Sequence, residues 1–266
     1  MKISFHSGGF VDKPLDWTIA HLASLGFDGI EIVTGPEAHI KNTATAAELE
    51  EVKGWLKEHG LVAAAINPYT APNISVMASE GTSGEFYRQL IDVAVGVGAK
   101  TVNFLPGTLP DGDAATWKIL VDGLKEVAPY AEERDVWLSC HNHEGMLIDM
   151  PEKILLLRDH VGSPCIKSLC DITNFHILHY PIEDAVEVLA EHIVHCHVKG
   201  VKGMYPYNEF LVPGEEGDEL PFHRFSTALK KIGYERFISI EVFQWMREDK
   251  AKIGIEMMRQ SVPAVA

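Results

Sequence analysis

The chain has 266 residues, of which 46% are hydrophobic and 23% charged, and its formal net charge at pH 7 is −15. These values are ordinary for a globular protein large enough to bury a substantial core. The 38 acidic residues outnumber the 23 basic ones, whereas proteins that bind a phosphate backbone concentrate Lys and Arg. No apolar run approaches the roughly 18 residues of a membrane span. We therefore expect neither a nucleic-acid nor a membrane partner.

The cysteines and the first residues bear on the cellular compartment. Cys140, Cys165, Cys170 and Cys196 form no CxxC pair, and three of them fall in apolar runs that predict strands. This pattern indicates buried thiols in a reducing compartment. The opening run MKISFHSGGF lacks the apolar segment of a secretory signal. Cytoplasmic localisation is the expectation.

Short apolar or β-branched runs alternate with longer amphipathic segments along the chain. The runs predict eight strands at Lys2–Phe5, Gly29–Val33, Val62–Ile66, Thr101–Leu105, Val136–His141, Ile166–Asp171, Ile193–Val198 and Phe237–Val242. Apolar spacing of i, i+3 and i+4 predicts helices such as Leu15–Leu25, Ala44–Glu58, Glu85–Val97 and Leu120–Glu132. Eight alternating units of this total length favour an α/β fold, a single (β/α)8 TIM barrel that forms one domain over residues 1–266. An open doubly wound sheet is the alternative, but Ser7–Gly9 lacks the GxGxxG spacing.

The longest stretch without periodicity is Gly200–Leu220, which contains Tyr205 and Tyr207. A loop of this length in a compact barrel is usually functional. We expect an irregular segment that serves as an active-site lid or as a wall for the substrate.

Ionisable side chains recur at the predicted carboxyl ends of four consecutive strands. These residues are His141, Asp171, His197 and Glu241. Side chains two apart on a strand share a face, so all four can point into one barrel mouth. Imidazole and carboxylate ligands suit Mn, Zn, Co or Fe better than Ca. The sequence therefore predicts a divalent metal ion (Mn, Zn, Co or Mg) at the carboxyl ends of the strands.

Each of these residues also has an ordinary structural explanation when it is taken alone. His195 or His197 could be a hydrogen-bonded core histidine, Asp171 could cap the next helical turn, and Glu241 could pair with a basic side chain. The four together are harder to explain in this way, because burying several ionisable groups in one barrel mouth is costly without a compensating cation.

These motifs resemble the xylose-isomerase-like barrel superfamily, the sugar phosphate isomerase/epimerase group that also includes inosose dehydratase and endonuclease IV. The resemblance rests on GFDGIE at 26–31, HNHEG at 141–145, CDITNF at 170–175, HIVHCHVKG at 192–200, PGEEGDE at 213–219 and GYERFISIE at 233–241. It implies a metal held by Glu, Asp, His and Glu from strands five to eight. Asp171, His197 and Glu241 match the last three ligands, and His141 stands where the family often has glutamate.

The resemblance implies a metal-dependent isomerase or epimerase that acts on a sugar, ketosugar or sugar phosphate through an enediolate. Glu241 is the expected base, and His143 or Glu144 is expected to serve as a second catalytic group. Because the imidazole of His141 cannot easily do the acid–base work of a carboxylate, elimination from a keto-inositol or 3-keto-sugar by a dehydratase or lyase is the alternative. The net charge of −15 disfavours a nuclease. A non-catalytic barrel would bind no divalent ion tightly.

Six residues at the same end of the predicted barrel are expected to contact the sugar or polyol substrate. They are His6, Glu31, Asn67, Asn174, His176 and Lys199. For Lys199 the alternative is an ion pair with Glu215 or Glu216. The sequence leaves open the identity of the substrate and the metal, and whether the chain forms a homo-oligomer.

Overall fold

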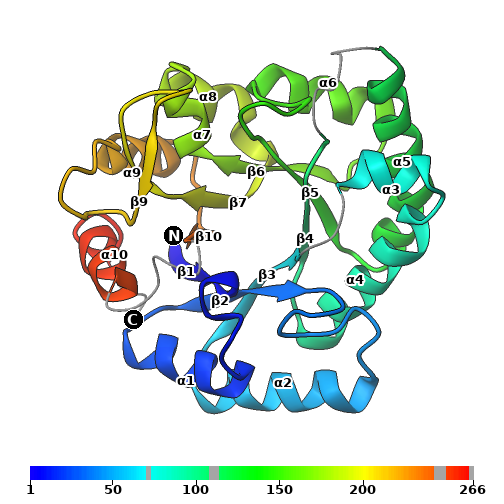
Figure 1. Cartoon of the computed structure of the whole chain (residues 1–266), viewed down its shortest axis with the longest axis horizontal. Coiled ribbons are helices and arrows are strands. Elements are labelled where there is room, and N and C mark those ends of the chain that lie inside the picture. Colours follow the sequence, from blue (N-terminus) through cyan, green and yellow to red (C-terminus); the bar gives the residue numbers. More distant parts are fainter. Residues whose placement is uncertain (70–72, 108–113, 243–249, 264–266) are drawn as a thin grey trace.

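Eight parallel strands form a closed barrel in the computed structural model, which describes residues 1–69, 73–107, 114–242 and 250–263. The barrel strands are β1 (Lys2–His6), β2 (Gly29–Thr34), β3 (Val62–Pro68), β4 (Thr101–Phe104), β5 (Trp137–His141), β6 (Ile166–Asp171), β7 (Ile193–Val198) and β10 (Phe237–Ile240). They follow one another around the barrel in chain order, and β10 closes it by pairing with β1 (Figure 1). The predicted (β/α)8 TIM barrel is confirmed.

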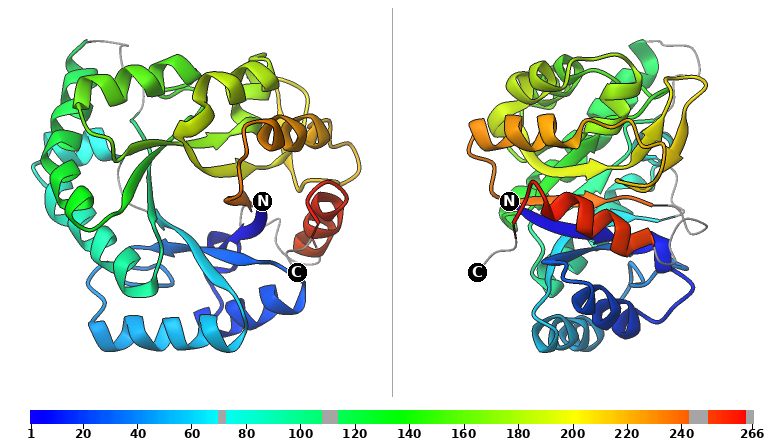
Figure 2. Two further views of the ribbon diagram at one scale, coloured as in Figure 1. Left: turned by 180° about the vertical axis from the view of Figure 1, so that it is seen from behind. Right: turned by 90° about the vertical axis from the view of Figure 1, so that its left-hand side faces the viewer.

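Helices surround the strands as an outer layer (Figures 1 and 2). They are α1 (Leu15–Ser24), α2 (Ala46–Glu58), α3 (Ile74–Ser79), α4 (Ser83–Val97), α5 (Ala114–Glu133), α6 (Pro151–Val161), α7 (Ile172–Ile177), α8 (Ile182–Leu189), α9 (Phe222–Lys231) and α10 (Lys250–Arg259), with short 3-10 turns at Ser7–Phe10 and Ala190–His192. The predicted helices coincide with α1, α2, α4 and α5 except at their ends. Helix α5 begins earlier than its apolar periodicity indicated.

Successive side chains of the barrel strands alternate between two buried environments. In β1, Ile3 and Phe5 are fully buried in the hydrophobic core, where the ring centroid of Phe5 lies 5.5 Å from that of Phe27. The opposite parity points into the barrel, since Glu31 of β2 contacts His195 of β7, a strand that is not its neighbour. The same parity places polar side chains at the end of the barrel where the strands finish.

The structure bears out the prediction of buried thiols. All four cysteines are free and buried. No helix in the described part of the chain combines the length and the apolar content that are needed to cross a membrane.

The prediction of an irregular segment from Gly200 to Leu220 is wrong in part. This stretch contains an antiparallel strand pair, β8 (Gly200–Lys202) and β9 (Glu209–Leu211). Strands this short show no alternation that a sequence pattern could reveal. A Cβ atom on Gly200 would lie 2.4 Å from the carbonyl oxygen of Val212, so the close approach requires glycine. The pair follows β7 and lies at the end of the barrel where the strands finish (Figure 2).

Candidate metal centre

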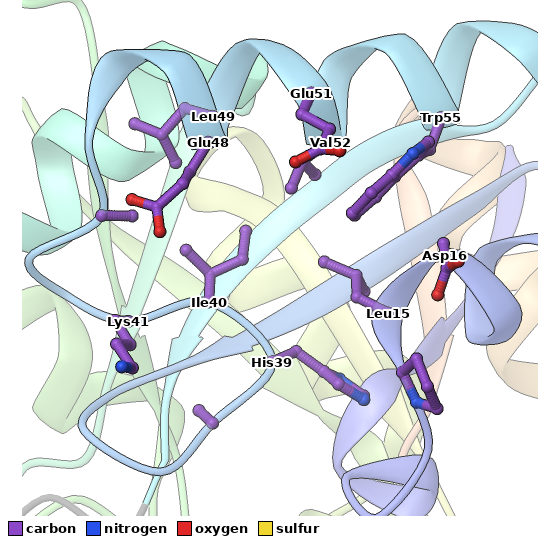
Figure 3. A pocket seen from close by; sticks show the side chains of 13 residues that line it. Leu15, Asp16, His39, Ile40, Lys41, Glu48, Leu49, Glu51, Val52 and Trp55 are labelled. Carbon is purple, nitrogen blue, oxygen red and sulfur yellow. The ribbon is translucent and has the colours of Figure 1, made fainter.

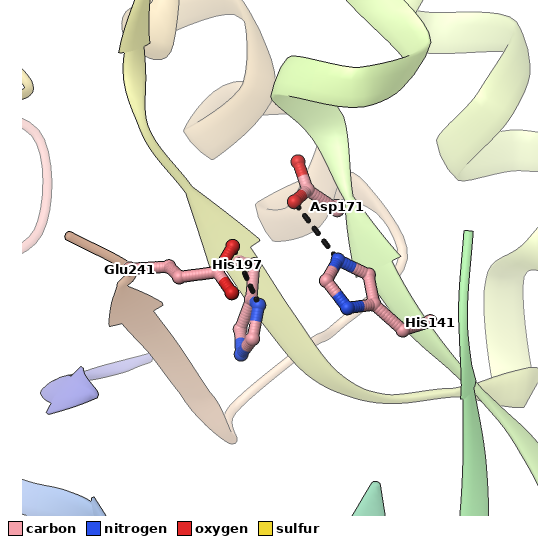
Figure 4. Close-up of side chains that lie close together, drawn as sticks. All are labelled: His141, Asp171, His197 and Glu241. Atoms are coloured by element: carbon pink, nitrogen blue, oxygen red, sulfur yellow. Dashed lines mark hydrogen bonds and ion pairs between the residues drawn. The ribbon is translucent and has the colours of Figure 1, made fainter. Parts of the chain in front are cut away.

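Four neighbouring barrel strands bring His141, Asp171, His197 and Glu241 together (Figure 4). His141 ends β5, Asp171 ends β6, His197 lies in β7, and Glu241 follows β10. Each offers one ligand atom, and these four atoms lie within 4.8 Å of one another. Nε2 of His141 is 3.0 Å from Oδ2 of Asp171, and Nδ1 of His197 is 3.4 Å from Oε2 of Glu241. The four candidate ligands from the sequence therefore form one cluster.

The side chain of Asp171 both caps helix α7 and contacts His141. Its Oδ1 accepts a hydrogen bond of 3.0 Å from the backbone N–H of Asn174, which caps α7. Its backbone is held by Asn142, whose Oδ1 accepts from the N–H of Asp171 at 2.8 Å and whose Nδ2 donates to its carbonyl at 2.9 Å. Helix capping thus does not compete with a role in the cluster, because it orients the second oxygen, Oδ2, toward His141.

Asn142 was not among the candidate residues from the sequence. It is fully buried, and its own carbonyl accepts a hydrogen bond of 2.9 Å from Nδ2 of Asn174. The only signal for it in the sequence is its place between His141 and His143 in the HNHEG run. Its bonds to Asp171 join β5 to β6 beneath the cluster.

Glu31 hydrogen-bonds Nε2 of the His197 ring, whereas Nδ1 of the same ring faces Glu241. Glu31 is fully buried, and its Oε2 accepts hydrogen bonds from Nε2 of His197 at 2.8 Å and from Nε2 of His195 at 2.9 Å. Its Oε1 accepts from Nδ2 of Asn103 at 2.8 Å. A carboxylate in this position fixes the tautomer of a ligating imidazole and raises its basicity. Glu31 thus bonds three buried side chains, and the substrate contact that its sequence position suggested stays a prediction.

The residues present fit a divalent ion. Nδ1 of His197 is buried and faces Glu241 without a hydrogen-bond partner in the described part of the chain. Because Glu31 takes the N–H at Nε2, the neutral form of His197 has its lone pair at Nδ1, where a metal can bind it. Two imidazoles and two carboxylates form a ligand set that transition metals of the Mn to Zn series accept. His141, Asp171, His197 and Glu241 would hold the ion.

A buried ammonium group lies within the same cluster. Lys199 directly follows β7, is 2% exposed, and donates from Nζ to Oδ2 of Asp171 and to Oε2 of Glu241, the latter at 2.6 Å. The alternative of an ion pair with Glu215 or Glu216 is wrong, because Lys199 pairs with Asp171 and Glu241. Glu215 pairs with Lys250 at 2.6 Å. The structure thus places Lys199 between two of the candidate metal ligands.

The pKa values of the two cluster histidines are shifted in opposite directions. Burial lowers the pKa of His197, but the carboxylates of Glu31 and Glu241 outweigh burial and raise this pKa to about 10. For His141, burial dominates over the hydrogen bond to Asp171 and lowers the pKa to about 4. Without a metal, His197 is therefore a cation at neutral pH and His141 is neutral.

The two cluster carboxylates are strongly stabilised as anions. Burial alone would raise the pKa of Asp171, but Lys199 and the hydrogen bond from His141 hold it below its ordinary value. Burial likewise works against the charge of Glu241, whose pKa is held well below its ordinary value by Lys199 and His197. The metal-free cluster thus holds two carboxylates beside one ammonium and one imidazolium, and the buried carboxylate of Glu31 bonds the same imidazolium.

His6 and Asn67 lie at the mouth of the barrel. His6 ends β1, is 7% exposed, and has both ring nitrogens buried without a hydrogen-bond partner among the residues that the structure describes. Its ring centroid is 5.9 Å from that of His197. A Cβ atom on Gly8 would lie 2.7 Å from Cε1 of His6, so glycine is needed for this ring position. Asn67, in β3, donates from Nδ2 to the carbonyl of Pro68 at 3.2 Å.

The remaining candidate residues lie outside the four-residue cluster. Nδ1 of His143 is 3.1 Å from Oε2 of Glu144, and the ring centroid of His143 is 5.6 Å from that of His141. These two residues therefore form a second pair beside the cluster. The charged groups that act on His176 include Glu219 rather than the cluster carboxylates.

A surface pocket elsewhere on the molecule is unconnected with this cluster. It is lined by Leu15 and Asp16 of α1, by His39 in the β2–α2 connection, and by Val52 and Trp55 of α2 (Figure 3). It lies in the outer helical layer, and its lining includes none of the candidate site residues. The candidate catalytic residues therefore lie at the barrel mouth and not in this pocket.

Comparisons with known proteins find relatives along the whole chain. Fructoselysine 3-epimerase of Shigella flexneri is 21% identical over 276 residues, which cover 99% of each chain. Inosose dehydratase of Clostridium perfringens (strain 13 / Type A) is 27% identical over 146 residues, 48% of each chain, so the match spans about half of that relative's length.

Solved structures share the fold at low sequence identity. A D-tagatose 3-epimerase-like protein has a TM-score of 0.82 at 20% identity, over 98% of this chain and 97% of the other. A D-psicose 3-epimerase, solved in the presence of D-fructose, has a TM-score of 0.79 at 19% identity, again over 98% and 97%. The family described as xylose isomerase-like TIM barrel matches residues 19–261, and the chain belongs to this family.

Proposed function

We propose that the protein is a divalent-metal-dependent epimerase or isomerase that acts on a ketosugar or a sugar phosphate. The observation that carries this proposal is the cluster of His141, Asp171, His197 and Glu241 at the carboxyl ends of four neighbouring strands. Catalytic residues of TIM-barrel enzymes lie at this end of the barrel. A relative named as a 3-epimerase that aligns with 99% of this chain supports the same class of reaction.

A bound divalent ion supplies Lewis-acid polarisation of a substrate carbonyl and stabilises the negative charge that develops on its oxygen. Glu241 is the proposed base for the proton on the adjacent carbon. Its side chain is 19% exposed, and its Oε2 faces Nδ1 of His197 among the candidate ligands, so Oε1 is the oxygen proposed to take the proton. The product of this step is an enediolate of the sugar.

The second proton transfer is assigned to the pair formed by His143 and Glu144. Nδ1 of His143 is engaged by Glu144, which leaves Nε2 to deliver a proton. Return of the proton to the same carbon from the other face gives an epimer. Return to the neighbouring carbon gives an aldose–ketose isomerisation.

Substrate binding is assigned to polar groups around the mouth. His6 is the strongest of these, because its unpartnered ring nitrogens can bond sugar hydroxyls. Asn67, Asn174 and Lys199 are further proposed contacts, and His176 stays a prediction from its position in the chain. With two imidazole ligands, manganese, zinc or cobalt is favoured over magnesium. The proposed enzyme is a cytoplasmic protein with one domain and a small-molecule substrate.

The proposal is tested by incubating protein loaded with Mn²⁺, Co²⁺, Zn²⁺ or Mg²⁺ with ketoses, their phosphates and keto-inositols in heavy water. The expected result by NMR is solvent deuterium on one substrate carbon and a new epimer or aldose, without loss of water. Asp171→Asn and Glu241→Gln should remove activity, whereas the exposed control Glu216→Gln should not. Full metal content and full activity in both site variants would contradict the proposal.

Dehydration is the second candidate. The match to inosose dehydratase over about half of the chain raises it, as does the imidazole of His141 in the position where the resemblance implies a glutamate. The same experiment separates the two functions, because elimination gives an unsaturated product from a keto-inositol. Such a product, without epimer, would replace the first proposal.

A further inference from the structure

Contacts from several elements fix the position of Lys199 in the proposed metal centre. Its backbone N–H donates to Oγ1 of Thr173 at 2.9 Å, and the Thr173 hydroxyl donates back to the Lys199 carbonyl at 2.9 Å. Its Nζ lies 5.4 Å from the centroid of the Phe210 ring in β9. Elements β7, α7 and β9 thus all define its position. A buried lysine held in this way is part of the architecture of the centre.

The ammonium of Lys199 bonds the same oxygens that a metal would need. Nζ donates to Oδ2 of Asp171 and to Oε2 of Glu241, and both residues offer ligand atoms to the cluster. Two cations on one pair of buried oxygens would repel each other at short range, where the low dielectric constant strengthens the repulsion. The two cations therefore compete for these oxygens.

The charge of the cluster supports this conclusion. An imidazole ligand carries no negative charge, so only Asp171 and Glu241 bring negative charge to the four-residue cluster. A divalent ion together with Lys199 would place three positive charges beside these two carboxylates, while the third buried carboxylate, Glu31, bonds the far nitrogen of His197. When no metal is bound, Oε2 of Glu241 faces both Nζ of Lys199 and Nδ1 of His197.

We propose that Lys199 is an internal counter-ion that a divalent metal must displace from Asp171 and Glu241. This inference rests on the proposed function for the identity of the metal centre, but it is independent of the substrate. Two properties follow from it. The metal is held as an exchangeable ion rather than permanently, and the metal-free protein stays folded because its buried carboxylates keep a partner.

The experiment is a titration of the full metal-free chain with Mn²⁺ by calorimetry and with Co²⁺ by visible absorption. Wild type is compared with Lys199→Met, Lys199→Gln, Lys199→Arg and the exposed control Lys202→Met. The expected result is an affinity that is on the order of tenfold higher or more in the Met and Gln variants. The Arg and Lys202 variants should not gain affinity. The Met variant should also have a lower Tm without metal and a larger rise in Tm on adding it.

The outcomes separate this inference from the proposed function. If wild type binds Mn²⁺ and neither neutral Lys199 variant binds it more tightly, the inference is overturned while a metal enzyme remains supported. If only the neutral variants bind metal, the inference is supported and a metal-dependent activity of the wild-type chain is contradicted. If no variant binds metal, both are overturned. Should Lys199→Met fail to fold, the Gln variant decides, since its amide can still donate to the carboxylates.

Discussion

Replacing Glu31 by Gln should weaken metal binding although Glu31 is not a proposed ligand. The carboxylate accepts from Nε2 of both His195 and His197, which leaves Nδ1 of His197 free of a proton and available to the ion once His197 is neutral. An amide is almost the same size, but its NH2 group can donate to Nε2 of His197. The ring proton then moves to Nδ1, which points it at the position of the metal.

The expected magnitude follows from these contacts. Loss of a partner that orients a ligating histidine typically costs 10- to 100-fold in metal affinity, or about 1.4–2.7 kcal/mol. The same change removes the anion that two buried imidazoles share, so the free energy of unfolding should fall by about 3–5 kcal/mol. Domains are typically stable by about 5–15 kcal/mol, so the variant should still fold.

Two measurements check this prediction. Calorimetry with Mn²⁺ gives the affinity, and urea unfolding of the metal-free protein gives the stability. Glu191→Gln is the matched control. Glu191 precedes β7, the strand that carries His195 and His197, and its side chain is 87% exposed. Wild-type affinity in Glu31→Gln would refute the argument that Glu31 sets the tautomer of His197, whatever the change in stability.

Three further predictions address separate features. His141→Glu adds a third carboxylate to the cluster and should tighten Mn²⁺ binding by about tenfold or more by calorimetry; weaker binding would contradict it. Tyr87 is fully buried with no hydrogen-bond partner for its hydroxyl among the described residues, so Tyr87→Phe should keep or raise the free energy of unfolding by up to about 1 kcal/mol in urea. Burial lowers the pKa of His39, so the folded state favours the neutral ring and loses stability as the pH falls below about 6.5. This loss, measured in urea between pH 7 and pH 5.5, should be smaller in His39→Gln, and an equal loss would contradict the assignment.

Strand periodicity was enough to find the barrel, because each strand is a continuous buried run between turns. The predicted bounds of β6 and β7 coincide with the observed ones. Other strands differ at their ends, where a residue can remain hydrogen-bonded outside the assigned strand. Glu241, for example, follows β10 yet donates its N–H to the carbonyl of Val198 at 3.0 Å. Such ends depend on the neighbouring strand, which a local pattern does not contain.

The candidate ligands could be found in the sequence because parity and strand ends are local properties. The partners of those ligands could not. Glu31 and His197 are far apart in the sequence and meet only because the barrel closes. Lys199 is two residues from His197, yet its bond to Glu241 depends on the position of β10 beside β7. Sequence spacing indicated which side chains share the mouth, and the closed barrel determines which of them touch.

His141 and Lys199 are best understood together. A carboxylate in place of His141 would give the four ligand residues three negative charges, in addition to the buried Glu31 that bonds His197. With an imidazole at this position only Asp171 and Glu241 of the four are negative, so the ammonium and the metal compete for the same oxygens. His141, which stands where the resemblance implies a glutamate, thus bears on how strongly Lys199 competes with the metal. The number of charges in the cluster, rather than any single ligand, decides how firmly such a centre holds its metal.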